Sequence, residues 1–145
     1  MAMRLNKLDD VRALLESGAD ANRLLYEAAK EPSHEPVEFL LEHGALPNAT
    51  GPWNETALHM AARRGEGAVK ILLDHGADAN ARNMYSSSPL HEAAAKANAR
   101  TIKVLLDHGA DPNARDVDDR TPLYLAIRHG NANTAAVLLD HGAKL

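Results

Sequence analysis

Paired leucines recur along the chain, and each pair is followed two residues later by Gly-Ala. The five copies of this Leu-Leu-x-x-Gly-Ala phrase occupy residues 14–19, 40–45, 72–77, 105–110 and 138–143, so that their glycines are separated by 26, 32, 33 and 33 residues. Apolar residues such as Val69 and Ile71 precede the pair, and a glycine after such a segment suits the left-handed conformation that ends many helices. The pattern predicts a helix before each glycine, repeated about every 33 residues.

A second phrase marks the start of another helix in each repeat. It is Thr-Ala-Leu-His at 56–59, Ser-Pro-Leu-His at 88–91 and Thr-Pro-Leu-Tyr at 121–124, with Leu-Tyr at 25–26 as a degenerate copy. The hydroxyl residue that opens each phrase predicts a helix N-cap, and the following proline suits the first helical position, where no amide hydrogen is needed. Alanine pairs at 61–62 and 93–94 follow one turn later and allow neighbouring helices to approach closely.

A period near 33 residues with a Thr-Pro-Leu-His-x-Ala phrase resembles the ankyrin repeat, a hairpin followed by two antiparallel helices. The resemblance covers nearly the whole chain and implies an all-α repeat solenoid with about four full repeats and a partial N-terminal one. The expected units of this single domain are 1–22 (partial), 23–50 (without its leading finger), 51–82, 83–115 and 116–145.

Polar segments between the expected helix pairs correspond to the projecting hairpins, or fingers, of the ankyrin unit. They cover residues 78–87 and 111–120. Residues 107–115 match residues 74–82 except for Pro112 in place of Ala79, whereas the tips Met-Tyr-Ser at 84–86 and Val-Asp-Asp at 117–119 share nothing. The two copies therefore share the residues at the base of the finger and differ at its tip.

The N-terminal part departs from this pattern. Leu25 follows Asn22 by three positions, whereas the equivalent leucine of each later repeat follows its asparagine by ten, so no finger is expected there. We expect the partial repeat to be regular only in a helix over residues 8–16, and a stiff loop over 31–36, with Pro36 at the first position of the next helix. The third repeat is one residue short between Gly65 and Val69, in the turn between its helices.

Composition narrows the class of function. The chain has 145 residues, of which 45% are hydrophobic and 25% charged, with a formal charge of −4 and no cysteine. These values fit one soluble folded domain, exclude disulfides and thiolate zinc sites, and disfavour nonspecific nucleic-acid binding. Neither a signal-peptide core nor an apolar span long enough for a bilayer is present. A cytoplasmic location is expected, with the nucleus or a host-cell cytosol as alternatives.

The chain carries no recognisable catalytic or metal-binding constellation. Seven of the eight histidines occupy repeat positions, and equivalent positions in neighbouring repeats are too far apart to share one metal ion, so we expect them to bond backbone groups near turns. The acidic run at 116–119 lacks the glycine and glutamate of a calcium loop. We therefore expect no enzyme activity, no metal and no cofactor.

The resemblance implies a binding surface formed by the finger tips and the exposed face of each first helix, because ankyrin proteins typically bind partners there. The expected finger positions are Trp53, Glu55, Met84, Tyr85, Ser87, Val117, Asp118 and Arg120, with Arg82 and Arg115 at the finger bases. The helix positions are Met60, Arg63, Arg64, Glu92, Lys96, Arg128 and His129. Tryptophan, tyrosine and arginine are enriched at binding hot spots. The alternative that Trp53 and Tyr85 fold back and brace the hairpins stays open, and Arg63 and Arg64 are expected to be solvated charges.

The leading interpretation is a monomeric module that binds another protein without catalysing a reaction. Three alternatives remain. The truncated start and the unmodified last helix would suit a segment of a larger ankyrin array with an architectural role. The number of repeats would suit a bacterial or viral effector that acts in a host cell, or a kinase inhibitor of the four-repeat ankyrin type.

Overall fold

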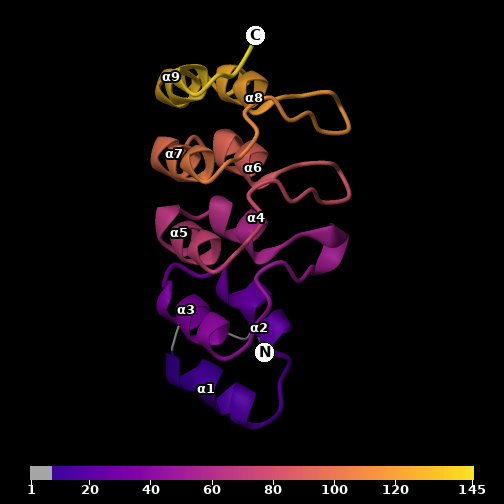
Figure 1. Ribbon diagram of the computed structural model, residues 1–145, viewed down its shortest axis with the longest axis vertical. Coiled ribbons are helices and arrows are strands. Elements are labelled where there is room, and N and C mark those ends of the chain that lie inside the picture. Colours follow the sequence, from indigo (N-terminus) through magenta and orange to yellow (C-terminus); the bar gives the residue numbers. More distant parts are fainter. Residues whose placement is uncertain (1–7) are drawn as a thin grey trace.

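The computed structural model describes residues 8–145 as a stack of helix pairs that runs from one end of the molecule to the other (Figure 1). A single helix, α1 (Leu8–Glu16), is followed by the pairs α2 (Ala21–Ala28) and α3 (Glu35–Glu42), α4 (Ala57–Ala62) and α5 (Glu66–Asp74), α6 (Pro89–Ala95) and α7 (Ala99–Asp107), and α8 (Pro122–Arg128) and α9 (Ala132–Asp140). A short 3-10 helix, η1 (Pro52–Asn54), lies in the loop before α4. The predicted all-α repeat solenoid is confirmed.

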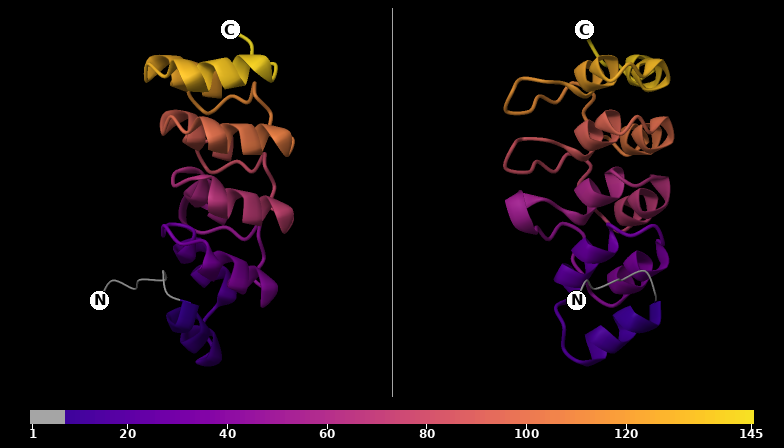
Figure 2. Two further views of the ribbon diagram at one scale, coloured as in Figure 1. Left: turned by 90° about the vertical axis from the view of Figure 1, so that its left-hand side faces the viewer. Right: turned by 180° about the vertical axis from the view of Figure 1, so that it is seen from behind.

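Three fingers project from the same side of the stack, as two further views show (Figure 2). We call them finger I (50–55), finger II (78–87) and finger III (111–120). Only four residues, 17–20, join α1 to α2, so the expected absence of a finger there is confirmed. Within the described part of the chain the β-structure is limited to one bridge between Thr50 and Thr56, at the base of finger I.

The first helices begin as the sequence predicts. The hydroxyls of Thr56, Ser88 and Thr121 accept backbone hydrogen bonds from the residue three positions later, at 3.4, 3.3 and 3.1 Å. Pro89 and Pro122 are the first residues of α6 and α8. Each cap satisfies an amide that the first helical turn would otherwise leave without a partner, which fixes where the finger ends and the helix begins.

The second helices end in a glycine with a left-handed backbone. Gly76 has a φ of +93°, its amide donates to the Leu73 carbonyl at 3.1 Å, and the Ala77 amide donates to the Leu72 carbonyl at 3.0 Å. This pair of bonds is the Schellman motif, and a residue with a Cβ would adopt that φ only with strain. Glycines 18, 44, 109 and 142 have φ values between +88° and +94°, so all five predicted helix ends are confirmed.

One continuous core of leucine and alanine runs through the stack. Leu58, Leu72, Leu90 and Leu105 are fully buried. The alanine pairs 61–62 and 93–94 are fully buried as well, between first helices that lie against each other. Small side chains at these contacts let the helices approach closely, which explains how a chain with 3% aromatic residues closes its core.

Asparagine side chains join successive repeats along the loops. Asn80 Oδ1 accepts from the Asp111 amide at 2.7 Å, and its Nδ2 donates to the Gly109 carbonyl at 3.0 Å. Asn48 and Asn113 make the equivalent pairs of bonds one repeat before and one repeat after. The period of the sequence therefore corresponds to a repeated contact between units as well as to a repeated fold.

Two local predictions need adjustment. Pro36 is the second residue of α3, not the first, because Glu35 opens the helix after His34. The shortened turn of the third repeat costs α5 its side-chain cap: Gly65 precedes α5, whereas α7 and α9 are capped by Asn98 and Asn131 at 3.1 and 2.9 Å. The helix predicted over residues 8–16 is confirmed as α1.

Candidate functional site

The fingers and the first helices α4, α6 and α8 enclose a concave surface. Figure 1 shows these helices between the fingers and the second helices. A pocket of about 270 Å³ opens on this surface. Its lining comes from all three fingers and all three helices: Trp53, Glu55, Arg63, Asn83, Tyr85, Ser87, His91, Glu92, Asp116, Arg120 and Leu125. Seven of the sequence-predicted site residues are therefore brought together in one place.

Fingers II and III are closed turns, each held by its own backbone and by one side chain, whereas finger I, with Gly51 at the equivalent position, is closed by backbone bonds. In finger II the Asn83 amide donates to the Ser87 carbonyl at 3.1 Å, and Asn83 Oδ1 accepts from the amides of Tyr85 and Ser87 at 2.9 and 3.1 Å. Asp116 does the same in finger III, where it accepts from the amides of Asp118 and Arg120, both at 2.9 Å. These bonds stabilise the conformation of the two tips.

Neighbouring fingers are also bonded to each other. The Met84 amide donates to the Trp53 carbonyl at 2.9 Å, and the Val117 amide donates to the Tyr85 carbonyl at 3.0 Å. Finger I carries Pro52 at the position equivalent to Met84 and Val117. Proline has no amide hydrogen, and no finger precedes finger I to accept one. The three fingers thus form one connected edge.

The tips of this edge expose large apolar side chains. The exposed fractions are 62% for Met84, 59% for Val117, 57% for Trp53 and 53% for Tyr85. Trp53 and Tyr85 therefore do not fold back against the neighbouring fingers. Their backbones take part in bracing the fingers, and more than half of each residue stays open to solvent.

Arg63 links finger I to two helices. From the C-terminal end of α4, its Nη2 lies 2.7 Å from Glu55 Oε2 in finger I, and its Nε lies 2.8 Å from Glu92 Oε2 in α6. The hydrogen bond to Glu92 raises the pKa of the Arg63 guanidinium, against the opposing effect of burial. The expectation that Arg63 is a plain solvated charge is wrong, because two carboxylates from different elements converge on it.

Two predicted contact residues are buried by their surroundings. Glu55 is 7% exposed because finger I holds it against Arg63. Met60 is 5% exposed and lies under the same arginine, whose Nη1 is 3.4 Å from the methionine sulfur. The expectation that Glu55 and Met60 face a partner is therefore corrected: both support the surface from below.

The arginines at the finger bases hold the fingers in shape. Arg82 Nη1 donates to the Ser86 carbonyl at 3.0 Å and to the Arg115 carbonyl of the next finger at 2.7 Å. Arg115 pairs with Asp119 at 3.0 Å, and Arg120 pairs with Asp116 at 2.9 Å and with Asp118 at 3.3 Å. Arg82, Arg115 and Arg120 are therefore surface residues that also stabilise the fingers.

Asp116 stays ionised at the centre of this arrangement. Burial would raise the pKa of its carboxyl group. Hydrogen bonds from the backbone and side chain of Arg120 and from the Asp118 amide outweigh burial and lower the pKa.

Four predicted residues lie away from the pocket. Arg64, Lys96, Arg128 and His129 are exposed at the C-terminal ends of the first helices, whereas the fingers adjoin the N-terminal ends. Arg64 reaches back to the preceding repeat, where its Nε donates to the Lys30 carbonyl at 2.6 Å. Arg128 Nη1 donates to the Tyr124 hydroxyl at 3.3 Å. The predicted set therefore divides into a finger-side group and a helix-end group.

Six of the seven histidines at repeat positions bond backbone groups, as predicted, whereas the His129 side chain makes no hydrogen bond to residues 8–145. In His43, His75, His108 and His141 the Nδ1 atom lies 2.8 to 2.9 Å from the carbonyl oxygen four residues earlier. The buried His59 and His91 reach the next finger, with Nε2 2.9 and 2.8 Å from the carbonyls of Ser87 and Arg120. Among residues 8–145, no group of three His, Asp or Glu side chains has the arrangement of a metal site.

Sequence reasoning missed two exposed apolar residues on α8. Tyr124 and Ile127 are 46% and 54% exposed, and they border a groove at the C-terminal end of the stack with Leu123 and Leu145. The signal was present in the repeats. Tyr124 replaces the histidine that reaches the next finger in α4 and α6, and Ile127 replaces the buried alanine of those helices.

Within the described part of the chain, no helix combines the length and the apolar character needed to span a bilayer.

Comparison with known proteins adds one positive finding. A family model described as ankyrin repeats in three copies matches residues 1–83, 25–116 and 83–145, which together cover the chain. No curated protein matched the sequence.

Proposed function

Because the chain belongs to the ankyrin-repeat family, whose repeats generally mediate protein–protein interaction, we propose that it binds a partner protein through its finger edge and the concave surface beside it. Proteins of this family are typically not enzymes. The proposal therefore assigns the molecule recognition and no catalytic step.

The observation that carries the proposal is the exposure of four apolar side chains on a rigid edge. Met84, Val117, Trp53 and Tyr85 are each more than half exposed. Large exposed apolar groups on a well-braced scaffold favour binding, because their burial releases water while little conformational freedom remains to be lost. Trp and Tyr are also the residue types most enriched at hot spots.

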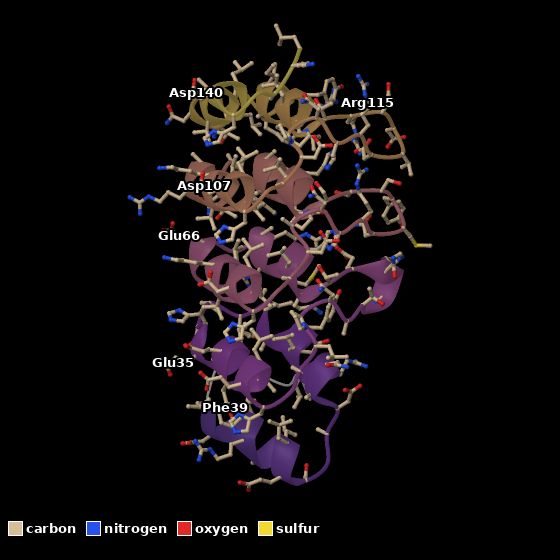
Figure 3. The ribbon with its side chains drawn as sticks, viewed as in Figure 1. Glu35, Phe39, Glu66, Asp107, Arg115 and Asp140 are labelled. Atoms are coloured by element: carbon tan, nitrogen blue, oxygen red, sulfur yellow. The ribbon has the colours of Figure 1, made fainter. Side chains whose placement is uncertain are left out.

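Among the described residues, the second helices on the opposite edge expose one large apolar side chain, Leu139 of α9, against four at the finger tips. Figure 3 shows Glu66, Asp107 and Asp140 along the edge of the second helices, away from Arg115 on the finger side. Asp107 and Asp140 occupy the same repeat position as Asp74, and such charged residues suit a solvated surface. The asymmetry between the edges supports the finger side as the one that contacts a partner.

Alanine substitution tests the proposal. The immobilised chain should capture a partner from a matched cell lysate, and Trp53→Ala and Tyr85→Ala should each weaken binding of the purified partner by more than about 1 kcal/mol. Leu139→Ala is the matched control, since Leu139 is 47% exposed on α9, away from the fingers. Circular dichroism should show that all three variants stay folded. Wild-type affinity in both finger variants would reject the proposal.

A second candidate is an architectural role within a larger ankyrin array. It is favoured by the apolar residues Tyr124, Ile127 and Leu139, which are exposed at the C-terminal end of the stack. Light scattering across a concentration series tests this role. An apparent molecular mass that rises with concentration in the wild type and stays constant in Ile127→Asp would support this role. A monomer at every concentration would reject self-association through this end.

A further inference from the structure

The pocket between the fingers has a composition that suits one kind of ligand group. Two half-exposed aromatic residues, Trp53 and Tyr85, belong to its lining together with the carboxylates of Glu55, Glu92 and Asp116. Leu125 adds an apolar contribution from α8. The combination of aromatic faces and carboxylates is the environment that stabilises a cation, because the face of an aromatic ring is electronegative.

The charges of the lining leave an excess of negative charge. The two guanidinium groups present, Arg63 and Arg120, are each paired with two carboxylates at distances between 2.7 and 3.3 Å. The third basic side chain of the lining, His91, is neutral: burial lowers its pKa, and its Nδ1 accepts from the Ser88 amide at 3.2 Å. Three carboxylates thus face two guanidinium groups.

The carboxylates also keep free acceptor capacity. Each carboxylate can accept about four hydrogen bonds. Glu92 accepts one from Arg63 at 2.8 Å and one from the Ser87 hydroxyl at 3.3 Å, and Glu55 accepts one from Arg63 at 2.7 Å. No other hydrogen bond reaches these two carboxylates from residues 8–145. An incoming cation would find acceptors already oriented, whereas an incoming anion would compete with carboxylates for paired arginines.

We propose that the pocket formed by Trp53, Tyr85 and Glu92 receives an arginine side chain of the partner protein. This inference rests on the proposed function and adds to it the chemistry of the partner. The guanidinium group stacks on the aromatic faces and donates to Glu92, which combines a cation–π contact with a charge-assisted hydrogen bond. The apolar finger tips bind the residues that flank this arginine.

The pocket can be tested without knowing the partner. Trp53 is the only tryptophan of the chain, so its fluorescence reports directly on the rim of the pocket. The probe is N-acetyl-arginine amide, and the control probe is N-acetyl-citrulline amide, which has nearly the same shape and no charge. Arginine amide should change the fluorescence in a saturable manner that weakens as salt is added, and citrulline amide should not.

Two variants locate the effect. Glu92→Gln keeps the shape of the side chain and removes its charge, and it should weaken binding of the arginine probe about tenfold, or about 1.4 kcal/mol. Tyr85→Leu removes one aromatic face at an exposed position, so it should weaken the probe even if Glu92→Gln proves unstable. Glu66→Gln is the matched control, because Glu66 is a carboxylate on the opposite edge of the stack (Figure 3).

The outcomes separate this proposal from the broader one. An equal response to both probes, the absence of a saturable response to arginine amide, or wild-type probe affinity in both pocket variants overturns the arginine pocket. If Trp53→Ala still abolishes partner capture in those cases, the proposed function stands and only the chemistry of the partner is wrong. If the arginine probe binds as expected but neither Trp53→Ala nor Tyr85→Ala affects partner binding, the proposed function fails instead.

Discussion

His59 Nε2 lies 2.9 Å from the carbonyl oxygen of Ser87, so a helix of one repeat is bonded to the finger of the next. The same imidazole faces the Thr56 amide through Nδ1 at 3.1 Å, which fixes Nδ1 as an acceptor and Nε2 as the donor. His91 repeats the arrangement with Arg120 and Ser88. These two histidines connect the scaffold to the edge that presents the finger tips.

The free energy of unfolding should fall as the pH is lowered from about 7.5 to about 5. Burial lowers the pKa of both histidines and outweighs the nearby carboxylates, Glu55 and Glu92 for His59 and Asp116 and Glu92 for His91. As the pH falls, the histidines of the unfolded chain therefore become protonated at a higher pH than those of the folded chain. The stability is complete above the ordinary histidine pKa of about 6.5 and is lost as the pH falls from there towards the lowered folded-state pKa.

Urea unfolding at several pH values measures this dependence. The double variant His59→Gln, His91→Gln should lose most of the slope between about pH 7 and pH 5, whereas His75→Gln, at an exposed helix end, should keep it. An unchanged slope in the double variant would assign the dependence to other groups.

Asn80→Ala should destabilise the fold by about 1 to 3 kcal/mol. The substitution removes two hydrogen bonds to the next repeat and leaves the Asp111 amide and the Gly109 carbonyl without their partner. Thermal unfolding measures the loss. Asn133→Ala is a suitable control, because Asn133 is exposed within α9 and makes no comparable bond among residues 8–145. Equal stability of the two variants would show that the asparagine contacts contribute little.

Thr101→Val should leave the stability unchanged or raise it by up to about 1 kcal/mol. Thr101 is fully buried in α7, and its hydroxyl oxygen has no hydrogen-bond partner among residues 8–145. Valine has nearly the same shape and no polar group to desolvate. Thr134→Val in α9 repeats the test in an equivalent environment. A loss of more than about 1 kcal/mol in both variants would reveal a hydrogen bond through water that the hydroxyl needs.

Hydrogen exchange should be fastest in the N-terminal repeats. In a solenoid each repeat is stabilised by its own contacts and by those with its neighbours. No finger joins α1 to α2, and α1 packs mainly on α3, whereas α6 contacts both α4 and α8. Amides of α1 and α2 should exchange before those of α4 and α6, as measured by mass spectrometry. The reverse order would contradict the expected distribution of stability.

The sequence predicts those features that depend on nearby residues. Thr56, Ser88 and Gly76 act within one helical turn, and their caps and helix ends could be assigned from spacing alone. Burial of Met60 and Glu55 could not be assigned in this way, because it depends on Arg63 and on how finger I folds over α4. The contacts of a long side chain such as Arg63, which bonds residues of two repeats, leave no periodic pattern in the sequence.

The exposure of the finger tips was equally undetermined by sequence. From the sequence, the side chains of Trp53 and Tyr85 could either pack against the neighbouring fingers or stay exposed. In the structure, backbone hydrogen bonds hold neighbouring fingers together, and both residues stay more than half exposed. Tyr124 and Ile127 could have been found, since each replaces a residue type that is constant in the two preceding repeats.

In the proposed function, the edge formed by the three fingers recognises the partner. The most direct measurement is amide chemical-shift mapping of the labelled chain on addition of its purified partner. The chemical-shift changes should concentrate in residues 50–55, 78–87 and 111–120 and at the N-terminal ends of α4, α6 and α8. Changes confined to the second helices α3, α5, α7 and α9, with the three fingers unaffected, would contradict it.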